Sequence, residues 1–123
     1  MADADFRARV LAQKTVWSAG AYDALSAKMI EEAGFDAVMT SGFGVAASFL
    51  GQPDAELYTM SENLTVVRNV ASAVRIPLVA DIDTGYGNAI NVMRTIREFE
   101  AAGVSAVIME DQVAPKRCPI CVG

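Results

Sequence analysis

Residues 79–88 read VADIDTGYGN, and the first two of them end an apolar run that begins at Ile76 and includes Pro77. Such a run is typical of a strand buried on both faces, and the proline stops the preceding helix. Asp81 and Asp83 then add two carboxylates spaced i, i+2, before a glycine-rich turn. Residues two apart in a strand point to the same face, so these carboxylates can converge. The stretch predicts a buried strand that delivers acidic side chains to one edge of a sheet.

Short apolar runs alternate with helical patterns on both sides of this stretch. Strands are predicted at Val16–Ala19, Ala37–Thr40, Leu78–Asp81 and Ala106–Met109, and helices at about Asp23–Ala33, from a Thr59 capping box to Val74, and from Asn88 to Gly103. The segment from Phe43 to Tyr58 is predicted to be irregular. Trp17, Phe49 and the methionines are predicted to lie in the core.

A weak internal repeat supports a parallel sheet. Glu31–Val38 is similar to Glu100–Val107, and each is a helix end, a glycine cap and a strand start. Repeated strand–helix–strand units indicate parallel strands joined by right-handed crossovers. A doubly wound sheet and a barrel of eight β/α units both fit this pattern. The barrel needs about 250 residues, so four visible strands would make residues 1–123 about half of one, a single partial domain.

Composition excludes several classes of function. The chain has 123 residues, 53% of them hydrophobic, and a net charge of -5. An acidic surface argues against binding to nucleic acid or to an anionic membrane. No apolar run approaches the ~18 residues that span a bilayer, and the N-terminus lacks a signal-peptide pattern, so a cytoplasmic location is predicted. The absence of histidine excludes Ser-His-Asp and Cys-His catalysis within this chain.

Polar residues follow three of the predicted strands. Ser41-Gly42 follow the second strand, Asp81 and Asp83 end the third, and Glu110 follows the fourth. In parallel α/β folds, function collects at the carboxyl ends of the strands. A cluster of carboxylates is unfavourable unless a proton or a cation intervenes, and oxygen ligands select Mg²⁺ or Mn²⁺. The alternative is that the two aspartates cap a loop or the next helix.

Other motifs allow two interpretations each. Ser41-Gly42 could present a hydroxyl and amides to an anion, or could be an ordinary tight turn. The CxxC of Cys118 and Cys121 offers two of the four ligands of a zinc site, or a thiol-exchange pair. Lys116-Arg117 could be a solvated charge pair, although they lie just beyond the carboxylate-bearing strand end.

Five motifs in order resemble the isocitrate lyase/phosphoenolpyruvate mutase superfamily. They are Ala37–Gly42 with Gly44–Ala47, Leu50–Asp54, Asp81–Gly87, Glu110–Gln112 and Lys116–Cys118. The resemblance runs from about Val16 to Cys118 and is strongest to the methylisocitrate lyase and oxaloacetate decarboxylase-like branch.

The resemblance implies a (β/α)₈ barrel that binds Mg²⁺ and a small carboxylate, namely a 2-oxo acid or its enolate, in a homo-oligomer. Carried over by position, it implies metal ligands at Asp81, Asp83 and Glu110, carboxylate binding by Ser41, Gly42 and the Phe43 amide, and Asp54 near metal and substrate. It also implies that Lys116, Arg117 and Cys118 begin a mobile loop over the site, with Cys118 as the catalytic acid.

The sequence departs from the superfamily pattern in two places. Pro119-Ile120 stand where the lyases have Gly-His, and the later strands of the barrel are missing. The expected function is a Mg²⁺-dependent enzyme that cleaves or decarboxylates a carbon–carbon bond through a metal-stabilised enolate. The alternatives are a truncated, inactive homologue, a phosphonomutase or phosphonopyruvate hydrolase, and a metal- or thiol-exchange module built on the CxxC.

Overall fold

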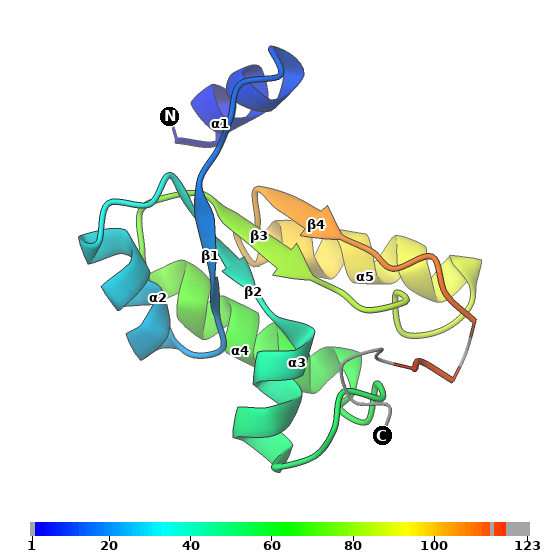
Figure 1. The fold of residues 1–123 in the computed structure, drawn as a ribbon. Coiled ribbons are helices and arrows are strands. Elements are labelled where there is room, and N and C mark those ends of the chain that lie inside the picture. Colours follow the sequence, from blue (N-terminus) through cyan, green and yellow to red (C-terminus); the bar gives the residue numbers. More distant parts are fainter. Residues whose placement is uncertain (1, 114, 118–123) are drawn as a thin grey trace.

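Four parallel strands form a sheet in the order β1-β2-β3-β4 (Figure 1). This computed structural model describes residues 2–113 and 115–117. The strands are β1 (Ser18–Ala21), β2 (Ala37–Thr40), β3 (Leu78–Asp81) and β4 (Ala106–Ile108). β2 and β3 match the predicted bounds, β4 is one residue shorter, and β1 begins two residues later than predicted.

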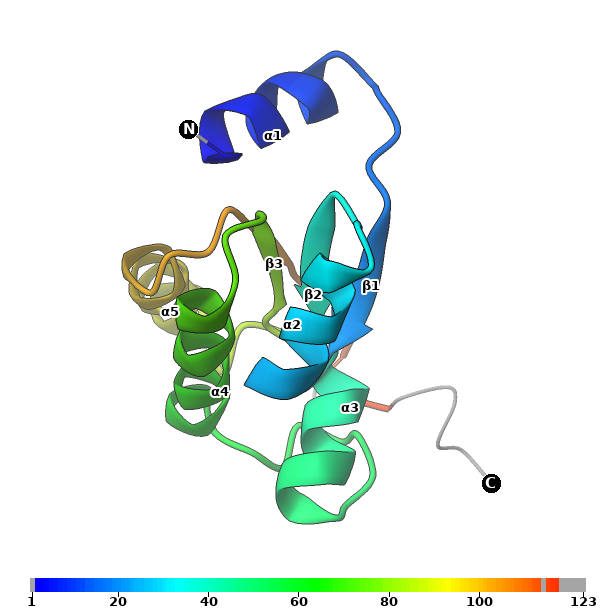
Figure 2. The same ribbon diagram turned by 90° about the vertical axis from the view of Figure 1, so that its left-hand side faces the viewer.

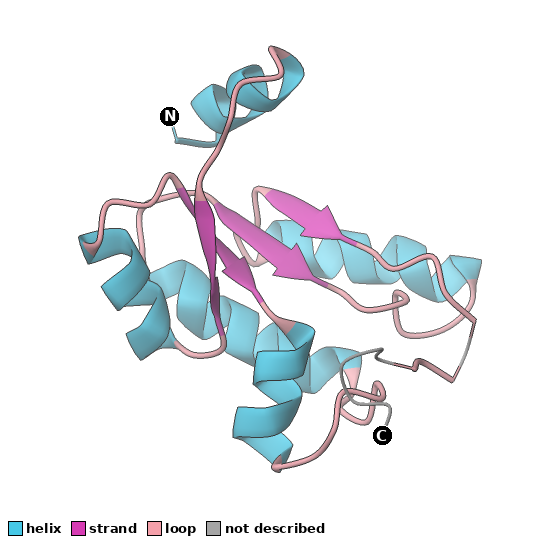
Figure 3. Cartoon of the chain, in the orientation of Figure 1, coloured by secondary structure: helices cyan, strands magenta, loops and turns pink. Residues whose placement is uncertain are grey.

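Helices connect the strands along one face of the sheet (Figures 2 and 3). α2 (Ala24–Glu32), α4 (Met60–Ala73) and α5 (Ala89–Ala101) are the three crossovers. A doubly wound sheet carries helices on both faces, whereas sequential parallel strands with helices on one face form a barrel wall. The arrangement confirms the predicted fold class, which is about half of a (β/α)₈ barrel.

Two further helical segments were not predicted. α1 (Ala2–Leu11) lies beyond the amino ends of the strands (Figure 1). α3 (Gly42–Val45) follows β2 and continues into a π-helical turn, η1 (Ala46–Leu50). The prediction that Phe43–Tyr58 is wholly irregular was therefore wrong, because Ser41 caps α3 by accepting a hydrogen bond from the Gly44 amide at 3.2 Å and starts a helix that hydrophobic periodicity does not reveal.

Helix starts were predicted well, since capping is a local interaction. The capping box is present: the Thr59 hydroxyl accepts from the Glu62 amide, and the Glu62 carboxylate accepts from the Thr59 amide at 2.6 Å. Asn88 caps α5 as predicted. None of the helices in the described residues is long and apolar enough to cross a membrane.

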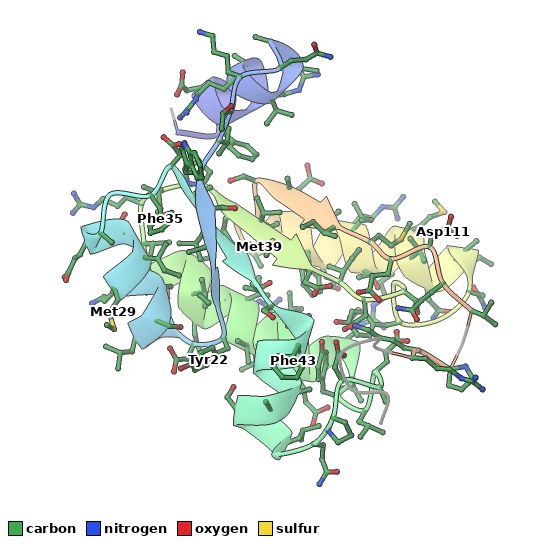
Figure 4. The ribbon with its side chains drawn as sticks, in the orientation of Figure 1. Tyr22, Met29, Phe35, Met39, Phe43 and Asp111 are labelled. Carbon is green, nitrogen blue, oxygen red and sulfur yellow. The ribbon has the colours of Figure 1, made fainter. Side chains whose placement is uncertain are left out.

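The core lies between the sheet and the helices that cover it. Its fully or nearly fully buried side chains are Val38, Leu64, Val67, Val70, Leu78, Ala80 and Phe99. The opposite face of the sheet carries Met39, labelled over the middle of the sheet in Figure 4, and Ile108, which is exposed. No helix of the described residues packs on this open face (Figure 2).

Several predicted core residues lie on the surface instead. Trp17 is 69% exposed, and Phe49, Met29, Met93 and Met109 are also exposed. Trp17 lies just before β1, which begins at Ser18. The methionines of α2 and α5 lie on outward helix rows, and the described part of the chain supplies no second layer to cover them.

Two apolar residues of α5 give a direct test of this packing. Phe99 is fully buried, whereas Met93 is 56% exposed. We expect Phe99→Ala to lower the free energy of unfolding by about 3–5 kcal/mol, because it opens a cavity. Met93→Ala should stay within about 0.5 kcal/mol of the wild type. Urea denaturation of both variants measures the difference, and equal destabilisation would contradict the assigned core.

Candidate active site

The carboxyl ends of the strands bring three connecting segments together (Figure 1). They are α3 after β2, the loop 82–88 after β3 and the segment 109–117 after β4. Main-chain hydrogen bonds extend the pairing of β3 and β4 past the strands: the Ile82 amide donates to the Ile108 carbonyl at 3.0 Å, and the Glu110 amide donates to the Asp83 carbonyl at 2.7 Å. This pairing places Glu110 beside Asp83, as the sequence predicted.

Asp83 is the most enclosed acidic residue of this region, with 0% of its surface exposed. Its Oδ2 accepts hydrogen bonds from the Tyr58 hydroxyl at 2.6 Å and the Tyr86 hydroxyl at 2.9 Å. Its Oδ1 accepts from the Nζ of Lys116. All the oxygens of this buried carboxylate are therefore partnered, as a buried charge requires.

Lys116 supplies the positive charge at the centre of the cluster. Its side chain is buried, and its Nζ lies 3.0 Å from Oδ1 of Asp54 and 3.4 Å from Oε2 of Glu110, in addition to its bond to Asp83. The Asp54 contact is close enough for an ion pair but is not aligned as a hydrogen bond. Burial alone would lower the pKa of Lys116, but its interactions with the carboxylates of Asp83 and Asp54 outweigh burial and raise that pKa above its ordinary value.

Asp81 lies beside this cluster and close to α3. Its Oδ2 accepts from the Gly42 amide at 2.9 Å, and its Oδ1 accepts from the Asp83 amide at 3.0 Å. Burial raises the pKa of Asp81, and these two hydrogen bonds oppose the rise. A Cβ at position 42 would lie 2.9 Å from Asp81 Oδ2 and 3.1 Å from Asp83 Oδ1. Glycine is therefore needed there for the close approach of the backbone to both acids.

The charges of the cluster do not balance. Asp54, Asp83 and Glu110 contact a single ammonium and Asp81 lies beside them, which leaves three negative charges in excess when all these groups are ionised. Such an excess favours an additional proton or cation. Carboxylate oxygens are the donors that Mg²⁺ and Mn²⁺ prefer, so the residues fit such an ion chemically.

The Lys116 ammonium already occupies Oδ1 of Asp83. Within residues 2–113 and 115–117, no group of three or more His, Cys, Asp or Glu side chains is arranged to hold a metal as it stands. A metal ion at Asp83 would compete with the Lys116 ammonium for Oδ1.

Three further predicted site residues, Ser41, Phe43 and Arg117, form no hydrogen bond or ion pair with the acidic cluster in the described part of the chain. Ser41 caps α3, and Phe43 is exposed on α3 at the carboxyl end of β2 (Figure 4). Arg117 is exposed, and its amide donates to Gln112 at 3.0 Å. Cys118 and Cys121 lie outside the described residues.

Sequence reasoning missed three polar residues that support the acids. Tyr58, Tyr86 and Asn63 form a hydrogen-bonded group behind Asp83. Tyr86 is part of the motif that follows β3, so the sequence motif could have identified it as a residue of the site. Tyr58 lies in the segment predicted to be irregular, and Asn63 is an ordinary helix residue in sequence.

Comparison with known proteins shows a clear relationship. The sequence model of the family described as "Phosphoenolpyruvate phosphomutase" matches residues 6–120. The 2,3-dimethylmalate lyase of Eubacterium barkeri is 49% identical over 120 residues, which are 98% of this chain and 42% of the relative. Sequences named 2-methylisocitrate lyase and oxaloacetate decarboxylase match as well. The chain therefore spans less than half the length of these relatives.

Solved structures agree with the sequence comparison. A phosphoenolpyruvate phosphomutase from Streptomyces platensis subsp. rosaceus superposes with a TM-score of 0.91 at 48% identity, covering 100% of this chain and 42% of that one. A phosphonopyruvate hydrolase in complex with oxalate and Mg²⁺ superposes with a TM-score of 0.89 at 43% identity, covering 95% of this chain and 41% of that one.

The central position of Lys116 predicts a large effect of its removal. We expect Lys116→Met to lower the free energy of unfolding by about 3–5 kcal/mol, because buried carboxylates lose their cation. Lys14→Met, at an exposed position, is the matched control. The folded pKa of Lys116 is raised above its ordinary 10.5, so its stabilisation is fully present below that pH and is lost as the pH rises through the folded value.

Urea titrations at several pH values measure this contribution. The difference in unfolding free energy between wild type and Lys116→Met should be constant from pH 7 to about 10 and should shrink only at higher pH. A difference that is absent at pH 7 would contradict the role of Lys116 as the counter-ion.

Proposed function

The chain belongs to the phosphoenolpyruvate phosphomutase family, and from that premise we propose that the protein is a Mg²⁺-dependent carbon–carbon lyase. Its proposed substrate is a small 2-hydroxy or 2-oxo di- or tricarboxylate, which it cleaves or decarboxylates. The observation that carries the proposal is the buried acidic cluster at the carboxyl ends of the strands, with its excess negative charge. We propose that residues 1–123 are the N-terminal half of the barrel that performs this reaction.

In this proposal Asp81, Asp83 and Glu110 hold Mg²⁺, or Mn²⁺ in its place. The bound ion would stabilise the negative charge that develops on oxygen when a bond next to a carbonyl or carboxylate breaks. The cluster offers hard oxygen donors and a deficit of positive charge, which support this assignment. The complex of a 43% identical phosphonopyruvate hydrolase with oxalate and Mg²⁺ supports it as well.

The organic part of the site would be held by residues around the cluster. The ammonium of Lys116 is a positive charge next to Asp54, where it can attract a substrate carboxylate. Ser41, Gly42 and the Phe43 amide are proposed to bind a carboxylate at the start of α3. The Gly42 amide also donates to Asp81. From the resemblance we propose that Arg117 binds the substrate as well and that Cys118 is the proton donor.

One alternative activity has specific support. A phosphonopyruvate hydrolase of Variovorax sp. is 50% identical over 96 residues, so phosphonopyruvate hydrolysis or phosphonomutase chemistry is the second candidate activity. The third candidate is a homologue that keeps the site residues but lacks turnover.

We also propose that the chain forms a homo-oligomer. The open face of the sheet and the outer helix rows expose apolar side chains, including Ile108 and Met93. Exposed apolar surface of this kind marks interaction sites. Sedimentation velocity at several concentrations tests this proposal, and a monomer at all concentrations contradicts it. The cytoplasmic location stays a prediction.

Assays with dimethylmalate, methylisocitrate, oxaloacetate and phosphonopyruvate test the proposed activity. We expect cleavage of one of the first three substrates that EDTA abolishes and added Mg²⁺ restores. Asp83→Asn should lower the activity by at least about 100-fold. Removing a residue that supports a metal ligand typically costs about 10- to 100-fold, and removing a metal ligand itself should cost more. Glu100→Gln, on the exposed end of α5, should leave the activity unchanged.

Direct metal titration separates the candidates that remain. Mg²⁺ binding without turnover of any substrate supports the inactive homologue. Turnover of phosphonopyruvate alone supports the second candidate. Turnover that persists in EDTA contradicts the metal-dependent mechanism in every form.

A further inference from the structure

We propose that Tyr58 and Tyr86 act as a phenolic clamp that holds one oxygen of Asp83, so that the other oxygen faces the cation site. The two tyrosines would be positioning residues, which act on the metal through Asp83 without touching it. This inference rests on the proposed magnesium site and adds to it the residues that set the orientation of a ligand.

The clamp is formed by two hydroxyls that reach one carboxylate oxygen from different segments. Tyr58 comes from the loop before α4, and Tyr86 comes from the loop after β3. Both donate to Oδ2 of Asp83, at 2.6 Å and 2.9 Å. A carboxylate oxygen has two lone pairs, so two donors saturate it. The carboxylate cannot rotate without losing both bonds, and Oδ1 is left for a cation, here the Lys116 ammonium.

Asn63 determines which way the Tyr86 proton points. The Nδ2 of Asn63 donates to the Asp81 carbonyl at 2.9 Å and to the Tyr86 hydroxyl oxygen at 2.7 Å. Because a carbonyl oxygen only accepts, the nitrogen of the Asn63 amide must face Asp81. The Tyr86 oxygen then accepts from Asn63, and its own proton is directed to Asp83. The chain of donors therefore links the Asp81 carbonyl to the Asp83 carboxylate, and both residues are among the three proposed ligands.

The backbone of the loop is bent to bring the Tyr86 ring back over Asp83. Asp83 has a φ of +50° and Tyr86 a φ of +62°, in the left-handed region that such residues seldom adopt. The Gly85 amide closes the turn by donating to the Ile82 carbonyl at 2.9 Å. An unfavourable backbone conformation persists when surrounding contacts impose it, and it concentrates at functional sites. Here the contacts are the bonds of Tyr86 to Asp83 and Asn63.

Burial shields the hydrogen bonds of the clamp from water. Asp83 and Tyr58 are both almost fully buried, so water cannot replace a lost hydroxyl at Oδ2 without a rearrangement. The two rings lie with centroids 6.3 Å apart at an interplanar angle of 52°, a packing that phenylalanine would retain. Tyr→Phe substitutions therefore remove the donors while keeping the shape.

Mn²⁺ binding to the full chain, followed by the electron paramagnetic resonance signal of the free ion, tests the clamp. We expect Tyr58→Phe and Tyr86→Phe each to weaken Mn²⁺ affinity about 10-fold, the size of effect typical for residues that orient a metal ligand. Tyr22→Phe is the matched control, because Tyr22 is exposed and lies outside the acidic cluster, and its affinity should equal that of the wild type. Circular dichroism establishes that each variant is folded before titration.

The Asp83→Asn background distinguishes positioning from packing. If the hydroxyls act through Asp83, adding Tyr86→Phe to Asp83→Asn should change the remaining Mn²⁺ affinity far less than it does in the wild type. Tyrosine variants that melt earlier but bind Mn²⁺ as tightly as the wild type would overturn the clamp and leave the magnesium site intact. A wild type that binds no Mn²⁺ would overturn the proposed function, and the clamp with it.

Discussion

The ammonium of Lys116 among buried carboxylates is the interaction on which the candidate site depends. Asp83 and Asp54 are almost fully buried, and removing charges from water is costly unless an opposite charge compensates. Lys116 and Glu110 come from the segment after β4, whereas Asp54 comes from the connection between β2 and α4 and Asp83 from the loop after β3. Its ion pairs therefore fasten the three connections to one another at the carboxyl ends of the strands.

The parallel sheet makes this convergence possible. The register pairs Asp81 with Ile108, and the amide of Glu110 continues the pairing by donating to the Asp83 carbonyl. The acidic residues of these two neighbouring strands therefore lie at the same level along the strand direction. On the other side, the missing side chain of Gly42 lets α3 approach both aspartates. Backbone geometry therefore places the acids, and side-chain hydrogen bonds then fix their orientation.

Most features that local sequence determines were predicted, whereas several that depend on distant contacts were not. The Thr59 capping box and the bounds of β3 follow from residues within a few positions of each other. The exposure of Trp17 depends on which layers cover the sheet, and periodicity does not report that. The burial of Lys116 was missed for a similar reason, because a lysine has no sequence signal for acids that the fold brings to it from other strands.

A single ammonium cannot neutralise four carboxylates, so the cluster favours a further cation. Such a cation would compete with Lys116, which lies in the segment after β4. Under the proposed magnesium site, the ion and the Lys116 ammonium compete for Oδ1 of Asp83, while the two tyrosines hold Oδ2. Thermodynamic linkage then requires that the Lys116–Asp83 ion pair lowers the affinity of the site for the metal ion. The bound metal ion would destabilise that ion pair by the same free energy. Under this proposal the position of Lys116 would be coupled to occupation of the magnesium site through one carboxylate oxygen.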